Sequence, residues 1–364
     1  MIQMNSSECP IIIIGSGPSG LMAALFAAKK RKVILIERPD RNFRLARRIL
    51  VSGNGRANFF NEDLLKEKDA EEVLSYLRDT LDVACHKEGK LYYPYFNRSE
   101  CLWTPLMAEV RRSGIDVRQL NASFIDSRTH TLTCQDGQDH NVDLGYDRLV
   151  IATGGLSYDR KDDNRHLFRN IPVHFSRFEP ALCPVVVDER IPFYLKNQRL
   201  RGILTVYAED EEIYREDGEI LFKADGLSGI AVFNSTIKVH EALRKNPQAK
   251  ITYQVDYTES QGETLTIRSD SSLPSFLRQY IKDNHLVLKA PLTFTFRDFY
   301  DFRESQVSFG GIALSDINEY YQLRQDNDIF VIGELLDRSY PCGGYNIGMG
   351  FIEGYRVGRK LMED

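Results

Sequence analysis

The sequence predicts an α/β fold in which helices pack on a parallel sheet, and three features indicate it. The apolar run 11–14 leads into the glycine-rich turn Gly15–Gly20. A second apolar run ends at Glu37, and a third, 149–151, also runs into glycines. Short β-branched runs of this kind are typical of strands that are buried on both faces of a parallel sheet.

The turn after the first run has the Gly-x-Gly-x-x-Gly spacing of a dinucleotide-binding site. The glycines permit a tight turn, and the N–H groups of the following helix face a pyrophosphate. Glu37 lies about twenty residues further on, where a carboxylate accepts a hydrogen bond from a ribose hydroxyl. We therefore predict dinucleotide binding; the alternative is a glycine turn without a ligand. The predicted contacts here are Gly15, Gly17, Pro18, Ser19, Gly20, Glu37 and Arg38.

Composition sets broad limits. A length of 364 residues suggests two or three domains. The formal net charge of −5 gives no general attraction to nucleic acid or anionic lipid. Six cysteines without a Cys-x-x-Cys pair or a metal-ligand spacing favour reduced thiols, a cytoplasmic protein and no metal site. We expect no membrane segment, because the glycine turn interrupts the uncharged stretch Cys9–Ala28.

An arginine-rich segment, 38–48, precedes a second glycine-containing loop. One interpretation is a solvated basic loop. The interpretation that we favour is a loop rich in hydrogen-bond donors that surrounds a polar cofactor and neutralises its phosphates. Its predicted contacts are Ser52, Gly53, Asn54, Gly55, Arg56 and Asn58, and those after the third apolar run are Ala152, Thr153, Gly154 and Gly155.

The remaining patterns predict elements around these motifs. Apolar spacing over 63–81 predicts one amphipathic helix. The aromatic stretch 89–96 is interpreted as a core strand and turn; the alternative is that some of its tyrosines line the pocket of a planar substrate. Short strands dominate from 178 onward, so 181–323 is expected to be an insertion that covers the reactive ring and forms part of the substrate cavity.

The C-terminal region contains a second anchor. A strand over 329–332 ends at Gly333 and is followed by a glycine-rich helix from 347 to 361. We interpret glycines 343, 344, 348, 350 and 354 as allowing the backbone to pass close to a flat ring, with the helix N-terminus near the ring's carbonyl oxygens. Such positive charge stabilises a reduced, anionic flavin. The predicted contacts are Gly333, Glu334, Asp337, Gly343, Gly344, Tyr345 and Asn346.

With these motifs, and with Gly226-Leu227-Ser228-Gly229, the chain resembles a family of bacterial flavoproteins that includes aminoacetone oxidase and BaiN-like reductases. The resemblance implies FAD and a Rossmann-type FAD-binding domain built from both chain ends, 1–180 and 324–364. It also implies an inserted β-barrel domain, 181–235 and 290–323, with a small helical subdomain, 236–289. The segments 53–58 and 343–346 would border the isoalloxazine ring.

The resemblance implies three chemistries: oxidation of an amine or aminoketone, reduction of a carbon–carbon double bond, and reduction of uridine to dihydrouridine in ribosomal RNA. We favour hydride transfer at flavin N5 with a small-molecule substrate over the RNA reaction. A flavin-binding protein without turnover is a further alternative. No second Gly-x-Gly-x-x-Gly is present, so NAD(P)H is expected only as a transient electron donor. The sequence indicates no oligomeric state.

Two residues depart from the family pattern. Ala57 stands where the family usually has cysteine, and Cys342 stands where it usually has a small hydroxyl residue before the paired glycines. The catalytic acid or base is not assigned by the sequence. Arg56, Cys342 and Tyr345 are candidates because of their positions.

Overall fold

The computed structural model describes residues 9–40, 43–157, 163–260, 263–264, 273–288 and 290–363. The chain divides into two compact units. The nucleotide-fold unit contains residues 1–155, 161–178 and 310–364, and the barrel unit contains residues 156–160 and 179–309. The more detailed three-part division expected from the sequence stays a prediction.

A mixed sheet forms the centre of the nucleotide-fold unit, with strand order β21-β22-β10-β1-β2-β6. The pairs β6–β2, β2–β1, β1–β10 and β10–β22 are parallel, and β21 pairs antiparallel with β22. The central strands β1, β2 and β10 are nearly continuous apolar runs, because both faces of the sheet are covered there. The strands are β1 (Ile11–Ile14), β2 (Val33–Glu37), β6 (Asp116–Gln119), β10 (Arg148–Ile151), β21 (Gln322–Leu323) and β22 (Asp326–Val331).

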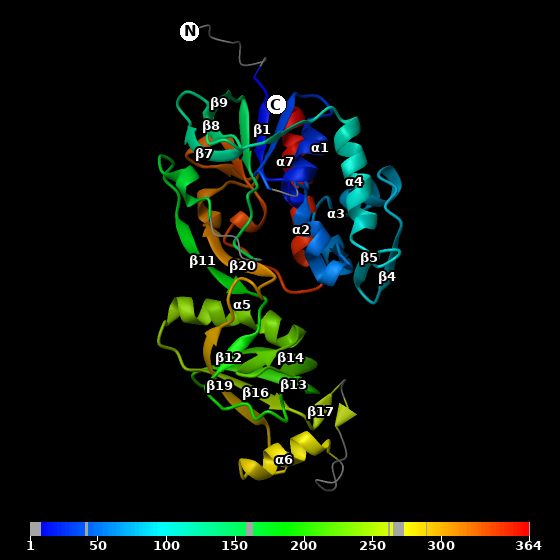
Figure 1. Cartoon of the computed structure of the whole chain (residues 1–364), viewed down its shortest axis with the longest axis vertical. Helices are drawn as coiled ribbons and strands as arrows, with labels where there is room; N and C mark the ends of the chain where they lie inside the picture. Colours follow the sequence, from blue (N-terminus) through cyan, green and yellow to red (C-terminus); the bar gives the residue numbers. More distant parts are fainter. Residues whose placement is uncertain are drawn as a thin grey trace. The chain divides into compact units, whose positions relative to one another are not determined.

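Both ends of the chain contribute to this unit. Figure 1 shows the first strand and helix beside the C-terminal helix, α7 (Tyr345–Glu363). The N-terminal helix, α1 (Pro18–Ala27), is buried along nearly its whole length, because α7 packs on it. This arrangement confirms the predicted FAD-domain type of fold built from both chain ends.

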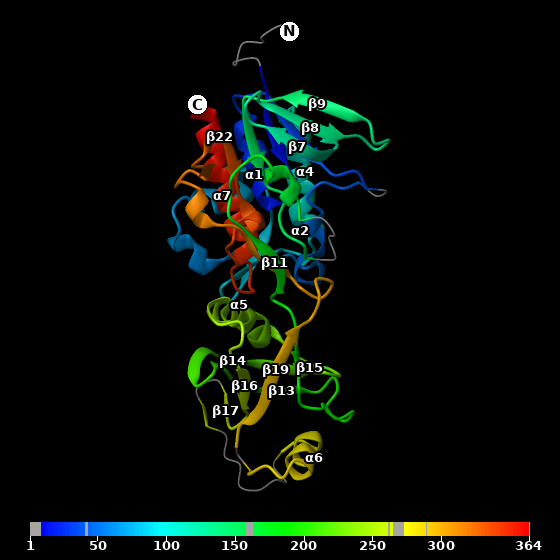
Figure 2. The ribbon, with the colours of Figure 1, turned by 90° about the vertical axis from the view of Figure 1, so that its left-hand side faces the viewer.

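Smaller elements surround the central sheet. Figure 2 shows the antiparallel sheet of β7, β8 and β9. A second three-stranded sheet has the order β3-β5-β4. The elements are α2 (Arg47–Val51), β3 (Phe60–Asn61), α3 (Ala70–Ser75), β4 (Cys85–Glu88), β5 (Leu91–Pro94), α4 (Glu100–Arg112), β7 (Asn121–Asp126), β8 (Thr131–Gln135) and β9 (Asn141–Gly145).

The predicted single helix over 63–81 is wrong. The segment contains a 3-10 helix (Glu62–Lys66), α3 and a π-helix (Tyr76–Thr80). The break occurs at Asp69, whose φ of 64° lies in the left-handed region. Asp69 also forms an ion pair with Arg356 of α7, with 3.1 Å between Asp69 Oδ2 and Arg356 Nε. The residue at which the helix is interrupted therefore makes a tertiary contact.

The barrel unit contains a closed six-stranded barrel with the order β12-β15-β14-β13-β16-β19, as the resemblance implied. Every second side chain of a barrel strand points into the core. In β16, these side chains are Ile251, Tyr253 and Val255, and all three are buried. The barrel strands are β12 (Val185–Val187), β13 (Arg199–Ala208), β14 (Glu211–Phe222), β15 (Gly226–Ser228), β16 (Ile251–Asp256) and β19 (Leu292–Phe299). The other elements of this unit are α5 (Ile230–Lys245), β17 (Glu259–Ser260), β18 (Glu263–Thr264) and α6 (Ser275–Asp283). Strands β11 (Phe175–Ala181) and β20 (Val307–Ile312) each contain residues of both units.

Candidate functional site

Four predicted motifs meet at one edge of the central sheet. The register pairs Ile14 with both Ile36 and Ile151, and Ile151 with Val331. The residues that follow these positions therefore leave the sheet side by side. They are the glycine turn Gly15–Gly20, Glu37, the segment 152–155 and the turn that begins at Gly333. The carboxyl edge of a parallel sheet is where this class of fold binds its ligands.

The glycine turn is packed on one side and open on the other. A Cβ on Gly15, whose φ is 100°, would lie 2.4 Å from the carbonyl oxygen of Ala152, and a Cβ on Gly20 would lie 2.0 Å from the Gly15 oxygen. A Cβ on Gly17 or Gly154 would meet no atom within 4 Å. The strand-to-helix backbone is thus held tightly while space remains beside its second glycine.

The N-terminus of α1 fits an anionic group. Its N-cap is Gly17, which provides no side-chain cap, and the first turn contains no acidic residue. No side chain of this turn therefore competes with a phosphate for the N–H groups at the helix start. Together with the open space beside Gly17, this donor set fits the pyrophosphate of a dinucleotide.

Glu37 is fixed beside the turn. The N–H and the hydroxyl of Ser16 donate to Glu37 Oε2 at 2.9 and 2.6 Å, and the Arg38 N–H donates to Oε1 at 3.0 Å. A carboxylate has about four acceptor positions, so these bonds orient Glu37 and leave acceptor capacity for a ribose hydroxyl. The role of Ser16 was missed because the x positions of the motif carry no signal in the sequence. Glu37 as the ribose ligand stays a prediction.

The loop 52–58 is tied to its surroundings rather than left solvated. Its backbone forms a 3-10 helix, Ser52–Gly55, and Gly55 has a φ of 81°. The N-terminus of α4 holds it, because the Ser99 N–H donates to the Gly55 oxygen at 2.7 Å. The backbone of Asn54 is described, but its side chain is not, so the predicted contact of Asn54 lies outside the described part of the chain.

Arg56 contacts the small β3-β5-β4 sheet. Its guanidinium donates to Glu88 Oε1 at 2.8 Å and to Asn97 Oδ1 at 2.9 Å, and it lies 4.3 Å from the centre of the Tyr93 ring. Asn58 also hydrogen-bonds Tyr93. These contacts favour a positioning role for Arg56, and the aromatic stretch supplies its partner.

The same small sheet contacts the C-terminal segment. Asn61 Nδ2 donates to the Gly343 oxygen at 2.8 Å. A Cβ on Gly344 would lie 2.7 Å from the Phe60 oxygen, so glycine permits the close approach of these backbones. Both segments predicted to border the flavin ring, 53–58 and 343–346, therefore pack on one three-stranded sheet.

Tyr345 faces an acidic residue that sequence reasoning did not single out. Its hydroxyl donates to Asp63 Oδ2 at 3.0 Å, and Lys90 Nζ lies 2.9 Å from the same oxygen. Burial and the bond to Asp63 raise the pKa of Tyr345. The bonds from Lys90 and Tyr345 lower the pKa of Asp63. At neutral pH, Tyr345 is therefore protonated and Asp63 is charged.

Asn346 closes a local loop. Its amide donates to the Tyr340 oxygen at 2.8 Å and accepts from the Tyr340 N–H at 3.2 Å. The catalytic candidate Cys342 is a reduced thiol of intermediate exposure. The structure thus brings Cys342, Tyr345 and Asn346 to one turn at the start of α7, but it assigns Asn346 a structural bond.

The interpretation of the later C-terminal glycines is wrong. A Cβ on Gly354 would lie 2.1 Å from the Ser19 oxygen of α1, and one on Gly358 would lie 2.7 Å from Phe26 Cβ. Gly350 also faces Ser19, and Gly348 faces Leu64. Gly350, Gly354 and Gly358 therefore let α7 approach α1, and Gly348 makes room for Leu64, so these glycines serve packing within the protein rather than approach to a ring.

Gly333 joins the two chain ends. A Cβ there would lie 2.5 Å from Ser19 Oγ, and its N–H donates to Glu353 Oε2 at 2.7 Å. Glu353 is 2% exposed and pairs with Arg338. Burial raises the pKa of the Glu353 carboxyl. Sequence reasoning missed this pair because nothing in a helical pattern marks one glutamate as buried.

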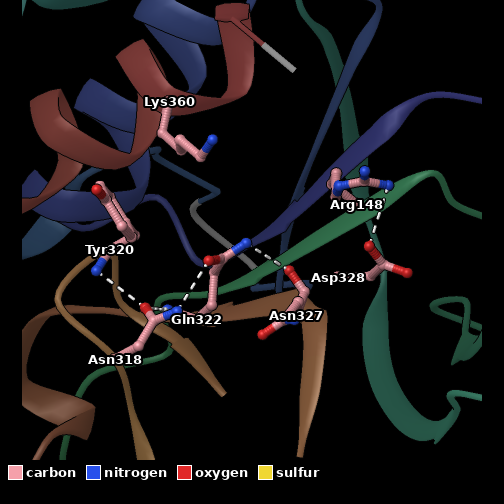
Figure 3. Close-up of a pocket in the computed structure, with 7 residues that line it drawn as sticks. All are labelled: Arg148, Asn318, Tyr320, Gln322, Asn327, Asp328 and Lys360. Carbon is pink, nitrogen blue, oxygen red and sulfur yellow. Dashed lines mark hydrogen bonds and ion pairs between the residues drawn. The ribbon is translucent and has the colours of Figure 1, made fainter. Parts of the chain in front are cut away.

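A separate polar pocket of about 450 Å³ lies near the amino end of β10 (Figure 3). Asn318 donates to Gln322, which donates to the Asn327 oxygen, and Arg148 pairs with Asp328 at 3.2 Å. Its polar groups bond to one another, and Arg148 begins the strand whose opposite end carries Ala152. This pocket is therefore distinct from the nucleotide edge.

Among the residues that the structure describes, no helix combines the length and the hydropathy that a membrane span requires. Within the same ranges, no group of three or more His, Cys, Asp or Glu side chains is arranged to hold a metal ion.

The family described as pyridine nucleotide-disulphide oxidoreductase matches residues 9–171. A 3-dehydro-bile acid delta(4,6)-reductase of Clostridium scindens is 23% identical, over 96% of this chain and 98% of that protein. A ribosomal RNA dihydrouridine synthase of Escherichia coli is also 23% identical, over 96% of this chain and 97% of that protein.

Among solved structures, a flavocytochrome c3 fumarate reductase in its open conformation has a TM-score of 0.52 at 14% identity, over 98% of this chain and 78% of that one. This likeness shows the fold. The family match and the similarity to a reductase support an FAD-dependent oxidoreductase whose substrate is unspecified. The chain thus has the mixed α/β fold of FAD-binding enzymes.

Proposed function

We propose that this protein is an FAD-dependent oxidoreductase that reduces a carbon–carbon double bond in a small organic substrate. The observation that carries the proposal is the convergence of four nucleotide-binding motifs at one edge of the sheet, with open space beside Gly17. The full-length similarity to a bile acid delta(4,6)-reductase favours double-bond reduction over amine oxidation. NAD(P)H is the proposed source of electrons.

The residues of the nucleotide-fold unit have distinct proposed roles. The α1 N-terminus binds the pyrophosphate, Glu37 binds the ribose, and the segments 53–58 and 343–346 border the ring. When bound, the flavin supplies hydride transfer at N5. Reduction of a double bond also needs a proton, and the Tyr345 hydroxyl, which is held by its 3.0 Å bond to Asp63, carries one at neutral pH. Tyr345 is therefore our candidate proton donor.

The purified protein tests this proposal in two steps. We expect an absorption band near roughly 450 nm from oxidised flavin. Anaerobic NADH or NADPH should bleach this band, and a 3-dehydro-bile acid with conjugated double bonds should restore it. Absence of the band, or of any bleaching by both nucleotides, would contradict the proposal. Bleaching by aminoacetone alone would instead indicate amine oxidation.

The RNA reaction is the second candidate, because a full-length relative is a ribosomal RNA dihydrouridine synthase. It requires a surface that binds phosphates, so retention of ribosomal RNA fragments on a filter should fall steeply with salt. Dihydrouridine in those fragments after incubation with NADPH would support it. RNA that is neither retained nor modified would remove it.

A further inference from the structure

The turn that follows β5 exposes two aromatic rings next to each other. Tyr95 is 60% exposed and Phe96 is 70% exposed, and their ring centres lie 5.3 Å apart in an edge-to-face arrangement. A single exposed ring is ordinary, whereas two in contact form an apolar patch. The sequence prediction of a core stretch therefore holds for Tyr93, which is 7% exposed, but not for these two rings.

The turn that presents the rings is rigidly built. The Tyr95 N–H donates to the Ala84 oxygen at 2.8 Å, and the Asn97 N–H donates to the Pro94 oxygen at 2.8 Å. Asn97 has a φ of 54°, and its side chain accepts from Arg56. Beneath the turn, His86 stacks on Tyr93 at 5.9 Å and meets the Tyr95 ring edge-on at 6.2 Å. A fixed platform loses little conformational entropy when a ligand stacks on it.

The platform belongs to the sheet that carries both predicted ring-bordering segments. Arg56 lies on Tyr93 of β5, and a Cβ on Gly343 would lie 3.3 Å from Leu91 of the same strand. Strand β5 therefore reaches from one of these segments to the other and continues directly into Tyr95 and Phe96. A substrate ring on these side chains would lie next to the predicted flavin site.

Charge around the turn is balanced. Arg56 pairs with Glu88 at 2.8 Å, Arg98 with Glu100 at 3.7 Å, and Lys87 with Glu62. These cations are already neutralised by carboxylates, so they offer no excess positive charge to a phosphate backbone. Exposed rings above a neutral surface instead favour a flat, uncharged ring system.

We propose that Tyr95 and Phe96 form an aromatic platform for a flat, uncharged ring system of the substrate, which one ring contacts with its face and the other with its edge. This inference rests on the proposed function and names its substrate class. Binding there is distinct from the redox step, so it can be measured on the oxidised protein without turnover.

The test is calorimetric titration of the oxidised, flavin-loaded protein with a 3-dehydro-bile acid. We expect Tyr95→Ala and Phe96→Ala each to raise the Kd about tenfold, because each removes one aromatic contact with the ligand. Tyr95→Phe should restore binding, since it keeps the ring. Phe193→Ala is the matched control, because Phe193 is an 88% exposed ring of the barrel unit, and it should leave the Kd unchanged.

The outcomes separate this inference from the proposed function. If the double variant Tyr95→Ala/Phe96→Ala keeps the flavin band and binds the bile acid as the wild type does, the platform is overturned and the proposed function stands. Tighter, salt-dependent binding of ribosomal RNA fragments that the same double variant loses would also overturn it, in favour of a nucleic acid surface. A wild-type protein without a flavin band overturns the proposed function instead.

Discussion

The two glycine-rich segments of the nucleotide-fold unit have similar compositions and different physical roles. In the N-terminal turn, Gly15 and Gly20 are tightly packed, but a side chain on Gly17 would meet open space. In the C-terminal helix, a side chain on Gly350, Gly354 or Gly358 would meet α1. Glycine density therefore marks close approach without identifying what approaches: the proposed cofactor in the first case and a neighbouring helix in the second.

Among the substitutions considered, we expect the largest loss of stability from one that leaves the buried Glu353 without its cation. Arg338→Met removes the cation that pairs with Glu353, so we expect the free energy of unfolding at pH 8 to fall by about 4 kcal/mol. Burial already raises the pKa of Glu353 above its ordinary value of 4.5, and loss of Arg338 raises it further. A carboxyl whose pKa is raised on folding stabilises least at high pH, so the loss should shrink as pH falls toward 5.

Urea unfolding of wild type and Arg338→Met at pH 5, 6.5 and 8 measures this difference. Arg359→Met is the control, because Arg359 also lies on a tyrosine ring but pairs with the exposed Glu363. A loss that is independent of pH would show that the guanidinium acts through packing rather than through the charge of Glu353.

The second prediction tests whether the C-terminal glycines let α7 pack on α1. Gly354→Ala places a methyl group 2.1 Å from the Ser19 backbone oxygen, so α7 must move away from α1. We expect the free energy of unfolding to fall by about 3 kcal/mol. Thermal unfolding followed by circular dichroism measures it. A Gly354→Ala protein as stable as the wild type would contradict the packing role of these glycines.

The third prediction tests whether the N-terminal glycine turn leaves space for a cofactor. Gly17→Ala adds a methyl group to open space at a φ of −59°, which alanine adopts without strain. Stability without cofactor should change by less than about 1 kcal/mol. The Kd for FAD should rise at least about tenfold, because the methyl group occupies the space expected for the pyrophosphate.

Fluorescence titration of FAD into apoprotein measures this Kd. Gly145→Ala is the matched control, since a Cβ there also meets no atom within 4 Å and Gly145 lies on β9. Equal FAD affinity for Gly17→Ala and Gly145→Ala would show that FAD does not occupy the space beside Gly17.

The smallest effect concerns the loop between the two glycine segments. Arg56→Lys keeps the positive charge but loses the planar guanidinium, whose Nη2 donates to both Glu88 and Asn97. The ion pair is exposed, so most of the expected loss of about 1 kcal/mol comes from the Asn97 bond and the contact with Tyr93. Urea unfolding measures it, and Arg98→Lys is the control. A loss confined to catalysis, with stability unchanged, would favour a catalytic role for Arg56.

Sequence reasoning succeeded where the signal was local. The strand, turn, helix and second strand over 11–37 form as expected, because apolar runs and glycine spacing act over a few residues. The closed barrel was implied by resemblance, and the strand alternation in 251–255 accounts for it locally. The helix over 63–81 failed because Asp69, a residue with no special local signal, makes a contact with Arg356 that is distant in sequence.

By itself, the sequence determined the order of strand, turn, helix and strand over 11–37 and the glycines at its turns, and the family resemblance implied that both chain ends build the domain. Only the tertiary structure decided what each glycine faces, that Glu353 is a buried acceptor for Gly333, and that Arg56 lies on Tyr93. The physical reason is range. Backbone conformation and strand burial depend on near neighbours, whereas the partner of a side chain is set by packing between segments up to several hundred residues apart.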